Sequence, residues 1–139
     1  MTREIKFRGK DILTDKWVYG DLLHLDNAYA IVTSYEEEEL KVNLISDRLE
    51  IRVEDIAGVY PETVGQFTGL LDKNGKEIWE HDIVDWDGVM LVVEFIDGRF
   101  CMQENYEDAT LHDLFFERDE INVIGNRFDN PELLKTEEP

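Results

Sequence analysis

The chain has 139 residues, of which 14 are Lys or Arg and 33 are Asp or Glu, so the formal net charge at pH 7 is 14 − 33 = −19. This length fits one domain or two very small ones, and a hydrophobic fraction of 42% excludes a chain that is disordered throughout. The large negative charge also disfavours direct, non-specific binding to nucleic acid, because it repels phosphate backbones.

The cysteine content and the hydropathy of the chain indicate the cellular compartment in which it folds. The single cysteine, Cys101, cannot form an intramolecular disulfide, which is typical of a reducing compartment. No apolar run approaches the roughly 20 residues needed to span a bilayer, and Met1 to Lys10 has no apolar signal region. We therefore expect a cytoplasmic protein that is neither secreted nor inserted into a membrane.

The first 63 residues are predicted to be a β-rich subdomain. Apolar and basic residues alternate over 5–8, as in a half-buried strand. Trp17 to Leu23 and Ala28 to Ser34 predict a hairpin closed around Asp26-Asn27. A further alternation over 49–54 predicts another strand with one wet face.

Two charged segments of this subdomain are candidate contact surfaces. Four consecutive carboxylates, Glu36, Glu37, Glu38 and Glu39, repel one another and favour an exposed loop or hairpin tip that a partner could bind. Four basic residues near the start could instead dock on an acidic second copy of the chain: Arg3, Lys6, Arg8 and Lys10. The alternative is that these basic residues only keep an exposed strand soluble.

Three Asx-Gly dipeptides organise residues 64–128. Asn74-Gly75, Asp87-Gly88 and Asp97-Gly98 each favour a two-residue turn with positive φ at both positions, the geometry that joins antiparallel strands tightly. Strands are expected around them at Val64 to Gly69, Asp82 to Trp86, Val89 to Ile96, Arg99 to Gln103 and Ile121 to Asn126.

A short helix is expected at Thr110 to Phe116, between the last two strands. Five short strands, tight turns and one irregular connection are the proportions of a small SH3-like barrel. We therefore predict a mainly all-β protein in which residues 1–63 are a β-rich subdomain and 64–128 an SH3-like barrel. Residues 129–139 would form a capped turn, with Asn130 at the N-cap, and a tail.

Several stretches of the chain resemble a known family. They are REIKFRGK at 3–10, WVYGD at 17–21, PETVGQFTGL at 61–70, DKNGKEI at 72–78, Glu80, DIV at 82–84, VIGN at 123–126 and NPELL at 130–134. Taken together they are similar to the YopX-like proteins of bacteriophages and prophages. The resemblance implies a β-rich fold with an SH3-type C-terminal half and no established activity. The chain has His81 where the family usually has Gly, so His81 must adopt a left-handed conformation or shift the local backbone.

The densest polar cluster is Glu80, His81, Asp82, Asp85 and Asp87. On a strand, Asp85 and Asp87 would share a face, and a nearby His could complete an oxygen and nitrogen site for a divalent cation. The spacing fits no known metal signature, and a solvated strand end accounts for the same residues. We therefore expect no metal and no cofactor.

Other reactive side chains have simpler explanations. His112 and Asp113 invite a general-base interpretation, but neighbours on a helix point about 100° apart, so we expect both on its exposed side, with Leu111, Leu114 and Phe115 facing the core. Cys101, between Phe100 and Met102 in a predicted strand, is expected to be a buried apolar residue. We accordingly assign no catalytic residue.

Aromatic side chains could instead line a peptide groove, as extended segments bind on SH3-type folds. Trp79 and Trp86 are the residues expected to face solvent. The leading prediction is therefore a small acidic module that binds a host or phage protein through charge and an exposed aromatic patch. The alternatives are a metal-dependent hydrolase that uses the Glu80 to Asp87 cluster, a self-assembling protein and direct nucleic-acid binding.

Overall fold

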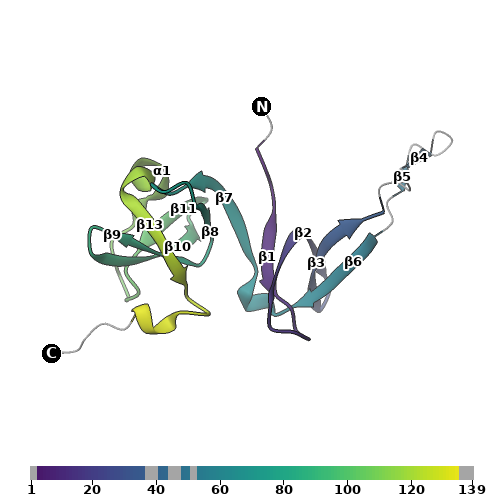
Figure 1. Cartoon of the computed structure of the whole chain (residues 1–139), viewed down its shortest axis with the longest axis horizontal. Coiled ribbons are helices and arrows are strands. Elements are labelled where there is room, and N and C mark those ends of the chain that lie inside the picture. Colours follow the sequence, from purple (N-terminus) through teal and green to yellow (C-terminus); the bar gives the residue numbers. More distant parts are fainter. Residues whose placement is uncertain (1–2, 37–40, 44–47, 51–52, 135–139) are drawn as a thin grey trace. The chain divides into compact units, whose positions relative to one another are not determined.

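The computed structural model describes residues 3–36, 41–43, 48–50 and 53–134, which are mainly β (Figure 1). The chain divides into two compact units. Ile5–Val64 is the N-terminal unit, and Gly65–Pro139 with Met1–Glu4 is the C-terminal unit, described to residue 134. None of the helices in the described residues is long and apolar enough to cross a bilayer.

The N-terminal unit is built on four antiparallel strands in the order β6-β3-β2-β1. They are β1 (Phe7–Lys10), β2 (Trp17–Leu25), β3 (Ala28–Tyr35) and β6 (Val53–Val59). Leu25 pairs with Ala28, which confirms the hairpin predicted around Asp26-Asn27. β4 (Lys41–Asn43) pairs with β5 (Arg48–Glu50), and a 3₁₀ turn, η2 (Pro61–Thr63), follows β6.

The outer strands of this sheet meet just beyond its edge. Asp11 forms a bridge with Val59, and the Thr63 hydroxyl accepts from the Lys10 N–H at 2.9 Å and donates to the Tyr60 carbonyl at 2.6 Å. Because the sheet curls in this way, the side chain of Ile31 on the central strand is fully buried.

The C-terminal unit contains a five-stranded antiparallel sheet in the order β12-β11-β10-β9-β13. Its strands are β9 (Asp82–Trp86), β10 (Val89–Ile96), β11 (Arg99–Gln103), β12 (His112–Asp113) and β13 (Ile121–Asn126). β7 (Gly65–Leu71) pairs with β8 (Glu77–Trp79) in a hairpin. The predicted strands of this half are confirmed and β8 was missed. The mainly β class is also confirmed, whereas the finer SH3-like barrel stays a prediction.

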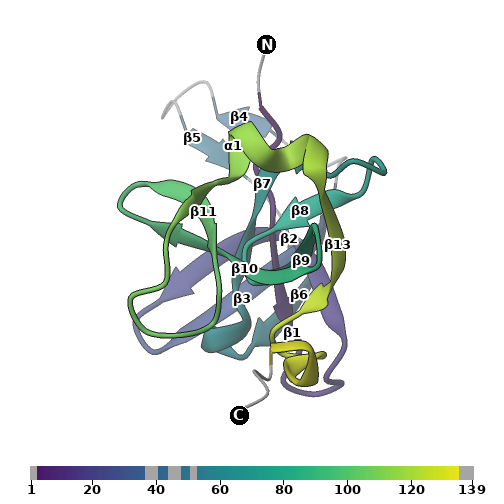
Figure 2. The ribbon, with the colours of Figure 1, turned by 90° about the vertical axis from the view of Figure 1, so that its left-hand side faces the viewer.

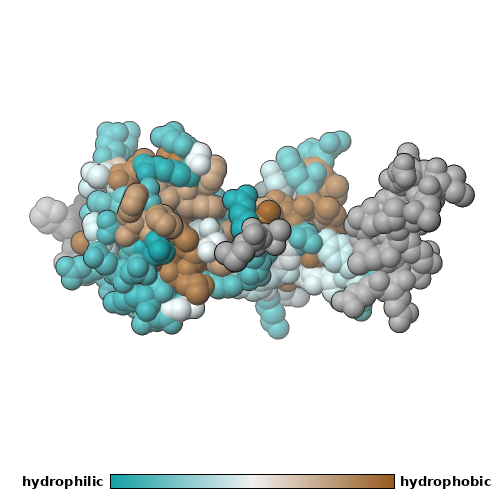
Figure 3. All heavy atoms as spheres, turned by 90° about the horizontal axis from the view of Figure 1, so that it is seen from above, coloured by the Kyte–Doolittle hydropathy of each residue, from teal (hydrophilic) through white to brown (hydrophobic). Residues whose placement is uncertain are grey.

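The predicted helix at Thr110 to Phe116 is wrong in extent. His112–Asp113 pairs with β11, and the Asp113 carboxylate then caps α1 (Leu114–Glu117) by accepting from the N–H groups of Phe115 and Phe116. Because α1 has only four residues, it buries Leu114 and leaves Phe115 and Phe116 exposed, contrary to the expectation for Phe115. Figure 3 views the molecule from the side on which α1 lies and shows apolar surface on this unit.

Two 3₁₀ turns complete the unit. η3 (Arg118–Glu120) leads into β13, and η4 (Pro131–Leu134) is the predicted turn after Asn130. Figure 2 shows α1 at one end of the C-terminal unit and η4, which is drawn in yellow, at the other.

The core of the C-terminal unit lies on one face of the five-stranded sheet. Alternation along β10 places Leu91 and Val93 on this face and Val92 and Glu94 on the other. The buried apolar residues that pack together are Ile78, Val84, Leu91, Val93, Met102, Leu114, Ile121 and Val123. The opposite face of β10 buries Val92 as well, but Glu94 on that face is half-buried and can contribute to a polar site there.

The turn at Asn74-Gly75 differs from the prediction. Asp87-Gly88 and Asp97-Gly98 have positive φ at both residues, as expected, but of the 74–75 pair only Gly75 does. Here buried Asp72 shapes the turn: its carboxylate accepts from the N–H groups of Asn74 and Lys76, and from that of Val123 on β13. One carboxylate thus fixes this turn to β13.

Candidate functional site

The site begins at His81, in the tight connection between β8 and β9. His81 has a φ of +77°, which confirms the left-handed alternative. Its N–H donates to the Val93 carbonyl at 2.7 Å and its carbonyl accepts from the Arg127 N–H at 3.0 Å. These two bonds hold the imidazole beside β10 and beside the segment that follows β13.

The His81 ring lies between two carboxylates. Its Nδ1 is 3.3 Å from Glu94 Oε2 and its Nε2 is 3.8 Å from Glu80 Oε2, while the Arg127 guanidinium donates to Glu94 Oε1. Burial by itself would raise the pKa of Glu94, but the hydrogen bonds and positive charges of His81 and Arg127 outweigh it and hold that pKa below its ordinary value. Glu94 is therefore an ionised carboxylate with the His81 ring beside one oxygen and the Arg127 guanidinium beside the other.

This cluster also bears on the metal hypothesis. Glu80, His81 and Glu94 can each offer one ligand atom, all within 4.8 Å of one another. The two ring nitrogens, however, face different carboxylates, so the imidazole bridges Glu80 and Glu94 and the three groups do not converge on one point. The geometry is that of an ion-pair network completed by Arg127.

The remaining acids of the predicted cluster serve the backbone. Asp82 Oδ2 accepts from the Trp79 N–H at 2.7 Å, Asp85 Oδ1 accepts from the Gly88 N–H at 2.8 Å, and Asp87 occupies the β9-β10 turn. The Glu80 to Asp87 cluster is thus split by the fold. Glu94 was not among the predicted site residues, because in sequence it is a lone acid among Met90, Val92 and Ile96 on one face of a strand.

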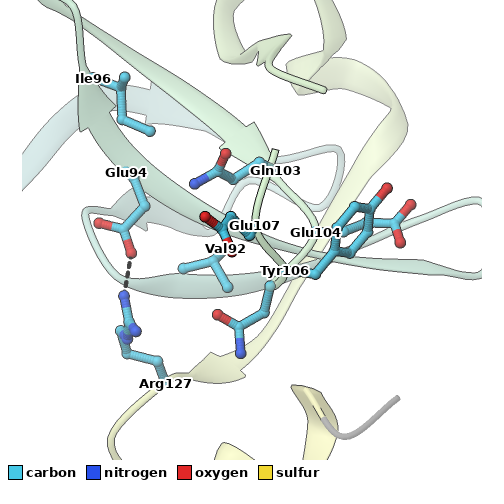
Figure 4. Close-up of a pocket in the computed structure, with 9 residues that line it drawn as sticks. Val92, Glu94, Ile96, Gln103, Glu104, Tyr106, Glu107 and Arg127 are labelled. Atoms are coloured by element: carbon cyan, nitrogen blue, oxygen red, sulfur yellow. Dashed lines mark hydrogen bonds and ion pairs between the residues drawn. The ribbon is translucent and has the colours of Figure 1, made fainter. Parts of the chain in front are cut away.

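An open cleft of about 480 Å³ lies over this face of β10 (Figure 4). Val92 and Ile96 give it an apolar side, and Glu94 and Arg127 line it as an ion pair. The segment after β11 supplies its other lining residues: Gln103, Glu104, Asn105, Tyr106 and Glu107. We call this the acidic cleft.

The acidic cleft has an excess of negative charge. It is lined by three glutamates, Glu94, Glu104 and Glu107, and one cationic residue, Arg127. Since Arg127 is paired with Glu94, the carboxylates of Glu104 and Glu107 are the charges left to attract a cation. Their segment turns back on itself through the Tyr106 carbonyl, which accepts from the N–H of buried Ala109.

The two predicted tryptophans differ. Trp79 is only 5% exposed, and its ring lies 5.5 Å from that of Phe67, so the expectation that it faces solvent is wrong. It is buried because β8 pairs with β7 and turns this side chain inward. Trp86 is half-buried, donates from Nε1 to Glu120 at 3.3 Å and lines a second cavity of about 530 Å³.

The charged candidate residues of the N-terminal unit also differ in their exposure. Glu36 is exposed at the end of β3, whereas Glu37, Glu38 and Glu39 lie outside the described residues. Arg3 is exposed, and Lys6 and Lys10 are half-buried. Arg8 is only 7% exposed, with its guanidinium 4.8 Å from the centre of the Trp17 ring, so it does not present the surface charge expected of it.

The remaining candidates have structural roles. Asp113 caps α1 and pairs with Arg99 at 3.2 Å, and the His112 ring lies 4.6 Å from that of Trp86. His112 and Asp113 therefore lie on β12, at its junction with α1. The expectation that they lie on the exposed face of a helix is wrong. Cys101 is fully buried, as predicted, and burial raises the pKa of its thiol.

These features define a small antiparallel β protein of two units, with an acidic cleft on the second. The chain belongs to the YopX protein family, whose match covers residues 6–135, and this confirms the resemblance seen in the sequence. The crystal structure of EF1440 from Enterococcus faecalis is 30% identical, with a TM-score of 0.66, over 96% of this chain and 100% of that one.

A second similar structure is that of yopX from Bacillus subtilis. It is 20% identical, with a TM-score of 0.48, over 99% of this chain and 100% of that one. No curated protein matches the chain.

Proposed function

We propose that the chain is a protein-binding module whose acidic cleft receives a basic side chain of its partner. The observation that carries this proposal is the placement of Glu104 and Glu107 in a cleft whose own arginine is already paired with Glu94. An incoming Lys or Arg side chain would lay its aliphatic stem on Ile96 and its charge beside the carboxylates of Glu104 and Glu107.

The net charge of the whole chain supports the same partner chemistry. A formal charge of −19 speeds encounter with basic partners and makes the association rate fall with salt. On the family resemblance, the partner would be a cytoplasmic protein of a phage or of its bacterial host. An SH3-like arrangement of the C-terminal unit would be consistent with peptide binding, since such folds receive extended segments.

The experiment uses a basic peptide without apolar side chains, fluorescein-labelled RRGGGGRR, and its acidic counterpart EEGGGGEE. Binding to the full chain is followed by fluorescence anisotropy at low and high salt. We expect the basic peptide to bind and the acidic one not to bind. The double variant Glu104→Gln, Glu107→Gln should weaken binding by about tenfold, because two close charge pairs are lost.

The matched control is Glu54→Gln, Glu62→Gln, which changes the net charge equally at two exposed residues of the N-terminal unit. It should weaken binding by about twofold at most, through long-range attraction alone. Equal losses in the two double variants would show that only net charge matters. That result, or a basic peptide that does not bind, would contradict the proposal.

A further inference from the structure

The second cavity, of about 530 Å³, lies at the end of β9 and on the opposite face of the sheet from the acidic cleft. Trp86 is the last residue of β9 and pairs with Val89 on β10 and with Ile121 on β13. Alternation along β10 places Val89 with the core residue Leu91 on one face and Glu94 of the acidic cleft on the other. We call this site the Trp86 cavity, and its lining residues are Lys73, Trp86, Asp87, Val89 and Glu120.

The indole of Trp86 is held in place from two directions. Its Nε1–H donates to Glu120 Oε2 at 3.3 Å, and the centre of the His112 ring lies 4.6 Å from that of the indole at an interplanar angle of 57°. The side chain also packs against the apolar cluster of the unit, which leaves it half-buried. A ring that is fixed before a ligand arrives costs little entropy to order on binding.

Three charged residues line the cavity beside this ring. Asp87, in the turn between β9 and β10, and Glu120, just before β13, contribute two carboxylates. Lys73, in the connection between β7 and β8, contributes one ammonium, and its N–H donates to the Ile121 carbonyl at 3.1 Å. The formal charge of the lining is therefore 1 − 2 = −1. All three residues are exposed and hence accessible to a ligand.

An indole beside two carboxylates suits a guanidinium group. A guanidinium is planar and positively charged, so it stacks on the face of an indole and donates two hydrogen bonds at a time to a carboxylate. The carboxylate of Glu120 can accept such bonds, because the Trp86 N–H occupies only one of its lone pairs. An ammonium is more strongly hydrated and does not stack in this way, and an anion would meet a net negative lining.

We infer that the Trp86 cavity binds a guanidinium group, which stacks on the indole and pairs with Asp87 and Glu120. The inference is independent of the proposed function, because the acidic cleft lies on the other face of the sheet. The group can belong to an arginine side chain of another protein or to free arginine. Lys73 separates these two sources, since its ammonium repels a side chain but attracts the α-carboxylate of the free amino acid.

The test follows the indole N–H of Trp86 by proton–nitrogen correlation NMR of the full chain. The chain has three tryptophans, so Trp86→Phe identifies the resonance, and that of buried Trp79 is the internal control. The probe is N-acetyl-arginine amide, and N-acetyl-citrulline amide is its uncharged counterpart of similar shape. We expect the arginine probe to shift the Trp86 resonance with a Kd in the millimolar range, and the citrulline probe to bind at least about tenfold more weakly.

The variant Asp87→Asn, Glu120→Gln should weaken binding of the arginine probe by about tenfold, because both charge partners are lost. Each new side chain keeps an acceptor oxygen, and Asn tolerates the positive φ of Asp87. Asp26→Asn, Glu62→Gln is the matched control, since it changes the net charge equally at exposed residues of the N-terminal unit. It should weaken binding by about twofold at most.

Lys73→Gln distinguishes the two sources of the guanidinium. If the ligand is a protein side chain, N-acetyl-arginine amide binds the wild type at least as tightly as L-arginine does, and Lys73→Gln strengthens its binding by about threefold. If the ligand is free arginine, L-arginine binds the wild type more tightly than the amide, and Lys73→Gln removes this advantage. Either result supports the guanidinium site.

Three results would overturn the inference. They are a Trp86 resonance that the arginine probe does not shift, equal binding of the arginine and citrulline probes, and a shift caused by acetate alone, which would assign the cavity to an anion held by Lys73. The variant Glu104→Gln, Glu107→Gln should leave binding at Trp86 unchanged. Failure of the basic peptide to bind the acidic cleft would therefore not affect this inference, and its own failure would leave the proposed function standing.

Discussion

The two units bury their apolar residues to very different extents. Among the residues that the structure describes, the buried apolar side chains of the N-terminal unit are Ala30, Ile31, Val32 and Val59, whereas the C-terminal unit buries 14. Among the same described residues, the N-terminal unit exposes eight large apolar side chains and the C-terminal unit six. The N-terminal unit therefore depends mainly on backbone pairing, and the C-terminal unit on a packed core.

This difference shows why the acidic cleft lies on the C-terminal unit. β10 buries Leu91 and Val93 on one face and Val92 on the other, and this packing holds the strand that carries the half-buried Glu94. A binding surface with fixed charges needs a rigid strand beneath it, because ordering it on binding would cost entropy.

The largest expected effect is that of a core substitution in the C-terminal unit. Leu91→Ala removes a fully buried side chain from the apolar cluster and should lower the free energy of unfolding by about 3 kcal/mol. Urea denaturation followed by tryptophan fluorescence measures this. A loss below about 1 kcal/mol would show that the core of the C-terminal unit is not tightly packed, which would contradict the contrast between the two units.

A loss of about 2 kcal/mol is expected for Asp72→Asn. The amide cannot accept from all three N–H groups of Asn74, Lys76 and Val123, so at least one buried donor loses its partner. Lys73→Gln, at an exposed neighbouring position, is the control. If both variants unfold at the same urea concentration, Asp72 does not fix the turn to β13.

Acid should destabilise the C-terminal unit through the same carboxylate. Burial acts to raise the pKa of Asp72, but the three N–H donors outweigh it and hold that pKa below its ordinary value. Because the folded pKa is the lower one, the stabilisation is complete above the unfolded pKa and is lost as the pH falls below it and through the folded pKa. Urea midpoints should fall over this range, and less steeply in Asp72→Asn.

A smaller effect, about 1 kcal/mol, is expected for Gly98→Ala. Gly98 has a φ of +81°, and nothing lies within 4 Å of an added Cβ, so the cost is conformational. Thermal unfolding monitored by circular dichroism would detect it. An unchanged melting temperature would mean that this turn can change type at no cost.

The smallest effect is expected in the N-terminal unit. Leu13 is 92% exposed, so Leu13→Ser should change the free energy of unfolding by less than about 0.5 kcal/mol. Urea denaturation under the conditions used for Leu91→Ala gives the comparison directly. A loss as large as that of Leu91→Ala would remove the distinction between the two units.

The strands of the C-terminal unit could be predicted because their signals are local. The turns at Asp87-Gly88 and Asp97-Gly98 lie at the two ends of β10, and the side chains between them alternate between the two faces of the strand. The turn at 72–76 could not be predicted, because its shape depends on Asp72 bonding to Val123, 51 residues away. The prediction of a helix over Thr110 to Phe116 was wrong for the same reason, because His112 pairs with β11 and does not join the helix.

The site was less predictable than the fold. Neighbours in sequence suggested the Glu80 to Asp87 cluster, but strand pairing separates its members and brings His81 to Glu94 and Arg127 instead. Trp79 and Trp86 have similar sequence surroundings, and only the pairing of β8 with β7 decides that the first is buried. Such contacts arise from pairings between distant segments, which alternation alone does not specify.

Because Cys101 is completely buried, a reagent can reach its thiol only when the surrounding structure opens. Because Cys101 is the sole cysteine, a thiol reagent can modify the native sequence at one position only. Its rate of labelling then measures how often β11 opens, and saturation of the acidic cleft by a basic peptide should slow that rate.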